Sequence, residues 1–213
     1  MSRAFDTAYN YIKENILTGV YLPSQKLIEV ELSDVTNVSR NTIKKVLLTL
    51  EQENLVNLEK NKGAIVKSFN LQEVINYMEI RILLEGLIAG SAAEKISDQQ
   101  LDQLQEILTE MSEHLEKKAY ADYSACNRKF HDIVYTASGN KQAAEMARKI
   151  RVQLQRISGK TLAISDRPSS SYKEHVMIYE ALKNRDGEKA KELIATHTSH
   201  VKNIIIDNYL LFT

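Results

Sequence analysis

The sequence is poor in the features that mark exported, membrane-spanning or disulfide-bonded proteins. It contains one cysteine, Cys126, in 213 residues, which excludes an intramolecular disulfide and suits a reducing cytosol. No apolar stretch approaches the roughly 18 residues that a membrane helix needs, and none follows a charged N-terminal start. We therefore expect a cytoplasmic protein with no membrane partner.

Net charge is also lacking. Lys plus Arg and Asp plus Glu both total 28, so the formal charge is zero. Overall electrostatics therefore cannot drive binding to nucleic acid, and only a local basic cluster could do so. The length of 213 residues suits two domains of ordinary size.

One local cluster of this kind follows Ser39. A serine is a good N-cap, and the residues after it predict a helix with one apolar stripe and one basic, amide-bearing side. The apolar stripe comprises Ile43, Val46, Leu47 and Leu50, and the opposite side carries Arg40, Asn41, Lys44 and Lys45. Alone, this pattern fits a solvated amphipathic helix equally well.

The flanking segments favour a DNA-binding interpretation. Pro23 precedes a predicted short helix that holds Leu27, Ile28 and Leu32. After the basic helix, Asn61-Lys62-Gly63 predicts a hairpin turn, and residues 64–66 a return strand. This order predicts a winged helix-turn-helix, which places one helix in the DNA major groove. The expected DNA-binding residues are Ser39, Arg40, Asn41, Thr42, Lys44, Lys62 and Gly63.

The remainder of the chain predicts helices with few strand signals. Pro168 is its one proline, and Ser165–Ser171 predicts its one polar loop. The fold class is therefore mainly α, with a winged helix-turn-helix domain at 1–69 and an all-α six-helix bundle at 70–213. We predict helices near 71–95, 98–118, 122–137, 141–159, 171–184 and 187–209.

All five histidines lie in this second half. Asn127 and His131 are four residues apart and share a helix face, while His175 and His197 lie on two later helices. Antiparallel packing of those helices could bring three imidazoles and one oxygen together as a site for Zn(II), Ni(II) or a similar ion. The alternative is a set of separate histidines, each hydrogen-bonded locally.

Residues 8–67 resemble the bacterial GntR family of transcription regulators. The resemblance rests on an apolar first helix ending in Gly, a Pro turn, a Leu-x-Glu-x-x-Leu stretch, a Val-Ser-Arg opening and a Gly-containing wing. The matching residues are Ile16, Leu17, Gly19, Pro23, Leu27, Glu29, Leu32, Val38, Ser39, Arg40, Leu47, Leu50, Leu55 and Gly63.

Two positions depart from that pattern. Lys44 stands where the family commonly has an arginine, and lysine lacks the bidentate fork that fits guanine. Val30 stands where the members closest to the fatty-acid regulator have another arginine. The operator sequence is therefore expected to differ from theirs.

Residues 71–211 resemble the FCD effector domain of the FadR group, nearest the VanR-like members. The motifs that carry this resemblance are Glu79-Ile80-Arg81 with Glu85, Asn127-x-x-Phe130-His131, Ser138-Gly139-Asn140, Glu174-His175 with Ala181-Leu182 and Asp186, and His197. The resemblance implies a metal held by Asn127, His131, His175 and His197, with Asn127 at a position that is usually Asp.

An amide oxygen brings no charge, so we expect weaker metal binding than an Asp would give. His200 is a less favoured substitute for His197, and His114 is expected to be an exposed helix residue.

The resemblance further implies a homodimer on a pseudo-palindromic operator in double-stranded DNA and a small carboxylic or sugar acid as effector. We expect a repressor that the acid releases. Arg81 is the first candidate for binding that acid, although a salt bridge with Glu85 one turn later is equally compatible. Arg148 or Arg151 could also face the site, and spacing does not decide which.

Two other function classes fit parts of the sequence. A metal-dependent hydrolase with an accessory winged domain would use the same histidines, but no HExxH motif or paired carboxylates adjoin them. A protein-interaction module is the second alternative, since some winged helices bind only proteins. We expect a regulator rather than an enzyme.

Overall fold

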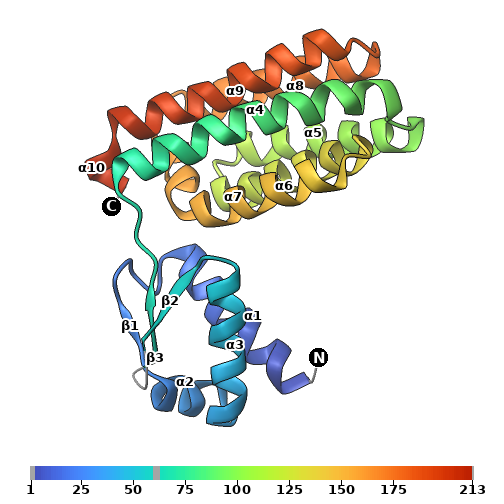
Figure 1. Ribbon diagram of the computed structural model, residues 1–213. Helices are drawn as coiled ribbons and strands as arrows, with labels where there is room; N and C mark the ends of the chain where they lie inside the picture. Colours follow the sequence, from blue (N-terminus) through green and yellow to red (C-terminus); the bar gives the residue numbers. More distant parts are fainter. Residues whose placement is uncertain (1–2, 60–62, 213) are drawn as a thin grey trace. The chain divides into compact units, whose positions relative to one another are not determined.

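The computed structural model describes residues 3–59 and 63–212, which divide into two compact units (Figure 1). The first unit is built on the N-terminal residues up to Asn70, and the second holds 71–151 and 157–212. The first contains α1 (Arg3–Thr18), β1 (Lys26–Leu27), α2 (Glu29–Thr36), α3 (Arg40–Gln52), β2 (Val56–Glu59) and β3 (Gly63–Val66).

The expected recognition helix is α3, and its start is set locally. The Ser39 hydroxyl accepts a hydrogen bond from the Thr42 backbone N–H, as the N-cap prediction requires. The predicted apolar stripe is buried at every position, with Ile43, Val46, Leu47 and Leu50 each at most 1% exposed. Burial of that stripe against α1 and α2 orients the opposite, basic side outward.

The strands form one antiparallel sheet in the order β1-β3-β2. Leu27 pairs with Ala64, and Val56 pairs with Val66. The prediction that Leu27 and Ile28 lie in a short helix was wrong, because Leu27 is in β1 and Ile28 is the extended residue before α2. Pairing with β3, nearly forty residues later, overrides the local apolar pattern.

The second unit contains six long helices, as predicted, and two short elements. Its members are α4 (Leu71–Lys95), α5 (Asp98–Glu116), α6 (Tyr120–Ala137), α7 (Lys141–Lys160), η1 (Thr161–Ala163), α8 (Arg167–Lys183), α9 (Gly187–Asp207) and α10 (Tyr209–Phe212). Helices α4 and α9 run side by side (Figure 1). Ser97 and Gln100 form a capping box at the start of α5.

The interior of this unit is mostly apolar and holds one large polar cluster. Aliphatic and aromatic side chains from α4, α5, α6, α7, α8 and α9 form a continuous core. Buried charged and polar side chains interrupt it, and they come mainly from α4, α6, α8 and α9: Arg81, Glu85, His131, Arg167, Glu174, His175, His197 and Thr198. Because unpaired buried polar groups are costly, such a cluster marks a candidate site.

The predicted polar loop at Ser165–Ser171 was wrong over most of its length. Helix α8 begins at Arg167 and places Pro168 in its first turn. Proline is tolerated there because the backbone N–H that it lacks would have no partner within the helix. Across the described residues, no helix combines the length and the apolar character needed to cross a bilayer.

Candidate DNA-binding face and metal centre

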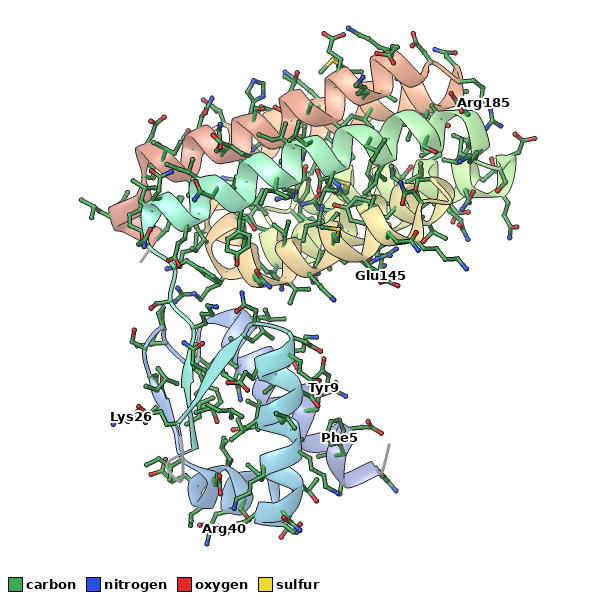
Figure 2. The ribbon with its side chains drawn as sticks, in the orientation of Figure 1. Phe5, Tyr9, Lys26, Arg40, Glu145 and Arg185 are labelled. Atoms are coloured by element: carbon green, nitrogen blue, oxygen red, sulfur yellow. The ribbon has the colours of Figure 1, made fainter. Side chains whose placement is uncertain are left out.

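The basic face of α3 is accessible. The side chains of Arg40 and Lys44 are 63% and 59% exposed, and Asn41 and Lys45 are also exposed. Arg40 lies at the start of α3, beside α2, where Figure 2 labels it. From α2, the Glu29 carboxylate lies 3.8 Å from the terminal nitrogen of each of Arg40 and Lys44. Sequence reasoning gave Glu29 no such role.

The other predicted DNA-binding residues differ in how accessible they are. Ser39 caps α3, and its hydroxyl lies 3.0 Å from the Thr42 hydroxyl, so both side chains stabilise the helix start. Gly63 is buried at the start of β3 with a φ of +95°. Lys62 lies outside the described residues. The DNA contacts of all these residues stay predictions.

The structure brings His131, His175 and His197 together in the interior of the second unit. They come from α6, α8 and α9, and one nitrogen of each ring lies within 4.8 Å of the others. All three are at most 2% exposed. The ring centroids of His175 and His197 are 4.6 Å apart, and both lie 5.5 Å from that of His131.

The hydrogen bonds of two rings fix which nitrogen is free. His175 Nδ1 lies 2.6 Å from the Ser171 carbonyl oxygen, and His197 Nδ1 lies 2.6 Å from a Glu174 carboxylate oxygen. Both oxygens can only accept, so each Nδ1 carries the proton. The Nε2 atoms therefore keep lone pairs, which is the state in which histidine binds a metal.

His131 is the exception within the cluster. Both of its ring nitrogens are buried and have no hydrogen-bond partner among the described residues. Burial lowers the pKa of His131 well below its ordinary value, and the charge of Arg151 lowers it further. Burial likewise lowers the pKa values of His175 and His197. The three rings are thus neutral donors, which suits a divalent metal.

Asn127, the predicted fourth ligand, adjoins the cluster. Its Oδ1 atom lies 2.8 Å from His175 Nε2. Since His175 carries its proton on Nδ1, the two facing atoms are both acceptors. Converging lone pairs with no proton between them suit a bound cation. The donor set therefore fits a metal, as do the unpartnered nitrogens of His131.

A carboxylate to which the sequence analysis gave no role at the site supports the cluster. Glu174 accepts hydrogen bonds from His197, from His200 at 2.7 Å and from Arg167 at 2.9 Å. Burial alone would raise the pKa of Glu174, but the hydrogen bond from His197 and the charge of Arg167 lower it to about 2. His200 thus binds Glu174 and is no member of the triad. His114 lies apart, partly exposed in the last turn of α5.

Glu85 forms a second buried charge centre. Its carboxylate accepts from Arg81 Nε at 2.9 Å, from the Thr198 hydroxyl at 2.7 Å and from the Tyr135 hydroxyl. Burial alone would raise the pKa of Glu85, but the charges of Arg81 and Arg151 lower it to about 2. The salt bridge of Arg81 with Glu85, which the sequence left open, is present.

The structure also shows which of Arg148 and Arg151 faces the interior, a question that helix spacing left open. Arg148 is 39% exposed and pairs with Asp132 at 3.0 Å. Arg151 is largely buried, and its Nη1 atom lies 3.6 Å from Glu85 Oε1. Arg151 therefore faces the polar interior.

A winged helix-turn-helix combined with a helical unit that holds a buried histidine triad defines a class of ligand-sensing DNA-binding proteins. Comparison with known families agrees with this class. Residues 5–66 match the family described as "Bacterial regulatory proteins, gntR family", and residues 76–200 match the FCD domain. The chain belongs to the gntR family of bacterial regulators and carries an FCD domain.

Curated relatives have regulator names. The chain is 22% identical over 197 residues to the HTH-type transcriptional repressor RspR of Escherichia coli, covering 92% of this chain and 86% of that protein. It is 26% identical over 218 residues to the galactonate operon transcriptional repressor of the same species, covering 90% and 93%.

Solved structures show the same fold. The structure of Escherichia coli McbR/YncC superimposes with a TM-score of 0.83 at 22% identity and covers 98% of this chain and 100% of its own. Its family and the names of its curated relatives make the protein a DNA-binding transcription regulator rather than an enzyme, which sets the hydrolase alternative aside.

Proposed function

We propose that the protein is a repressor that a small carboxylic or sugar acid releases from its operator. In this proposal, residues 1–69 bind DNA, and residues 70–213 bind the effector and dimerise. A divalent transition metal, Zn(II) or Ni(II), is held by Asn127 and the three histidines. The observation that carries the proposal is the buried His131 ring, whose two nitrogens have no hydrogen-bond partner among the described residues.

The donor chemistry supports Zn(II) or Ni(II). Neutral imidazoles and an amide oxygen are borderline ligands, and four protein ligands leave coordination positions for an acid on an octahedral ion. When bound, the metal supplies a Lewis-acidic contact for a carboxylate. Glu174 and the Ser171 carbonyl orient two of the rings through their Nδ1 protons, as outer-shell groups do in metal sites.

An acid is the favoured effector for two reasons. Arg81 and Arg151 both lie beside Glu85 within 4 Å of its carboxylate, so the polar interior holds more than one positive charge. Arg81 is the first candidate to bind the acid, and Arg151 approaches the same carboxylate. One relative is named for the operon of galactonate, a sugar acid.

A homodimer is proposed on the basis of an uncovered apolar stripe. Ile80, Leu83 and Leu87 lie on one face of α4 and are 44%, 75% and 54% exposed. Contiguous exposed apolar side chains commonly mark association surfaces. Two copies would present two α3 helices to the half-sites of a pseudo-palindromic operator. The Leu83→Glu variant should sediment as a monomer, and an unchanged dimer would place the interface elsewhere.

In this proposal the acid releases the regulator from DNA because acid binding and operator binding are thermodynamically coupled. If the acid binds better to an arrangement that does not fit the operator, it weakens operator binding by that difference in affinity. The cytoplasm, where the operator DNA lies, is the proposed location.

Fluorescence anisotropy tests the proposal. The operator is first located by band shift on the DNA upstream of the protein's own coding region. Metal-loaded protein is then titrated on this labelled DNA with a panel of short carboxylic and sugar acids that includes galactonate. We expect at least one acid to weaken binding in the wild-type protein and in His114→Ala, but not in His131→Ala. If no acid changes operator affinity in the wild-type protein, the sensor role is wrong.

A further inference from the structure

We propose that Arg151 is the residue that anchors the acid, whereas Arg81 is the structural counter-ion of Glu85. This inference rests on the proposed acid-sensing function and deepens it. The ligand class is a small organic anion whose carboxylate meets the Arg151 guanidinium on one side and the histidine cluster on the other.

Arg81 is already engaged. Its Nε atom donates to Glu85 Oε1 at 2.9 Å, and its side chain is only 6% exposed. The same carboxylate also accepts hydrogen bonds from the Tyr135 and Thr198 hydroxyls. The Arg81 guanidinium therefore balances the buried charge of Glu85, and drawing it away would leave that charge uncompensated, which is strongly disfavoured.

Arg151 is not engaged in this way. Its Nη1 atom is buried and has no hydrogen-bond acceptor within the described part of the chain. The closest carboxylate oxygen, Glu85 Oε1, is 3.6 Å away, which exceeds hydrogen-bond length. The guanidinium also lies over the Tyr135 ring, 5.9 Å from its centroid, which holds the side chain in place. A buried guanidinium N–H without an acceptor is a site that an anionic oxygen would complete.

Arg151 lies close to the histidine triad, because both it and His131 approach the same oxygen of Glu85. Glu85 Oε1 lies 3.6 Å from Arg151 Nη1 and 3.8 Å from His131 Nδ1. The unpartnered nitrogens of Arg151 and His131 therefore lie around the same oxygen. A carboxylate bound beside the triad is within reach of the Arg151 fork.

The balance of charge favours an anion at this point. Glu85 compensates Arg81, and Glu174 compensates Arg167. Arg151 is the remaining cation that contacts Glu85, so one positive charge is left over in the interior. Arg148, one turn earlier on α7, is paired with Asp132 at the surface and offers a matched control.

The test uses the full-length protein loaded with Co(II), whose visible spectrum reports changes in the ligands around the ion. Acetate is the anionic probe, and acetamide is a neutral probe of the same shape. We expect the acetate dissociation constant to rise at least about tenfold in Arg151→Gln, with Co(II) affinity and the acetamide response unchanged. Arg148→Gln should behave as wild type, and Arg151→Lys should recover part of the acetate affinity because it keeps the charge without the fork.

Three outcomes distinguish failure of the Arg151 assignment from failure of the proposed acid site. An equal acetate response in Arg151→Gln and wild type overturns the assignment to Arg151 while leaving the acid site standing. Loss of Co(II) binding in Arg151→Gln also overturns it, because the residue would then act on the fold of the cluster. If the wild-type protein gives no spectral change with acetate, the proposed acid site itself fails.

Discussion

Glu174 holds His197 in place through a hydrogen bond of 2.6 Å from Nδ1 to a carboxylate oxygen. The same carboxylate accepts from Arg167 and His200, so its position is fixed from three sides. This arrangement occupies Nδ1 and leaves the Nε2 lone pair of His197 available to a metal shared with His131 and His175. Glu174 therefore acts on the cluster through another residue, as a positioning group.

Replacing Glu174 with Gln should weaken metal binding by about 10- to 100-fold, because the amide holds the His197 proton less firmly and leaves Arg167 without its charge partner. Calorimetric titration with Zn(II) measures the change. Glu180→Gln, an exposed position on the same helix, is the control. Equal affinities for the two variants would show that Glu174 does not support the site.

Replacing Asn127 with Asp should strengthen metal binding, since the carboxylate adds a negative charge at an atom 2.8 Å from His175 Nε2. The metal affinity should rise about tenfold or more, which is the size of effect that changes around a metal's ligands commonly have on affinity. Competition with a chromophoric chelator measures it. An affinity that does not rise would place the Asn127 side chain outside the coordination shell.

The metal-free protein should lose stability as the pH falls below about 6.5. The pKa values of His131, His175 and His197 are all lowered in the fold, chiefly by burial, so the unfolded chain binds more protons in this range. Each histidine contributes up to about 1.4 kcal/mol per pH unit to the fall. Urea unfolding between pH 7.5 and 5.5 tests this, and His175→Gln should flatten the slope. A slope that is the same in both proteins would contradict the expectation.

Replacing Arg40 with Ala should weaken operator binding by about 1–3 kcal/mol and relax sequence preference if the residue reads a base. Its side chain is 63% exposed at the start of α3, so the fold should be unaffected. Anisotropy on operator and scrambled DNA measures both effects. An equal loss on the two DNAs would make Arg40 a phosphate contact.

Replacing Glu29 with Gln should raise affinity for scrambled DNA more than for the operator. Its carboxylate lies 3.8 Å from both Arg40 and Lys44. Its negative charge should repel DNA phosphates, and the two ion pairs should fix the relative positions of the Arg40 and Lys44 side chains. Because the Arg40 and Lys44 side chains are exposed, each pair should contribute only about 0–1 kcal/mol, and a change of a few-fold is expected. Glu31→Gln on the same helix is the control, and identical DNA affinities for both variants would count against this role.

Much of the first unit was predictable because its determinants are local. The Ser39 cap and the apolar stripe of α3 involve neighbours within a few turns, and the structure places them as expected. Leu27 was misassigned because its strand partner, Ala64, is distant in sequence. The six long helices of the second unit were likewise predictable from their helical hydrophobic periodicity and their capping residues.

The sequence by itself determined that α3 has a basic side and that Asn127 and His131 share a helix face. Only the tertiary structure decided that three histidines from α6, α8 and α9 converge, that Glu174 orients one of them, and that Arg151 rather than Arg148 faces inward. The physical reason is that helical periodicity fixes which residues share a face. The rotation of each helix about its own axis is set by the packing of all its neighbours together.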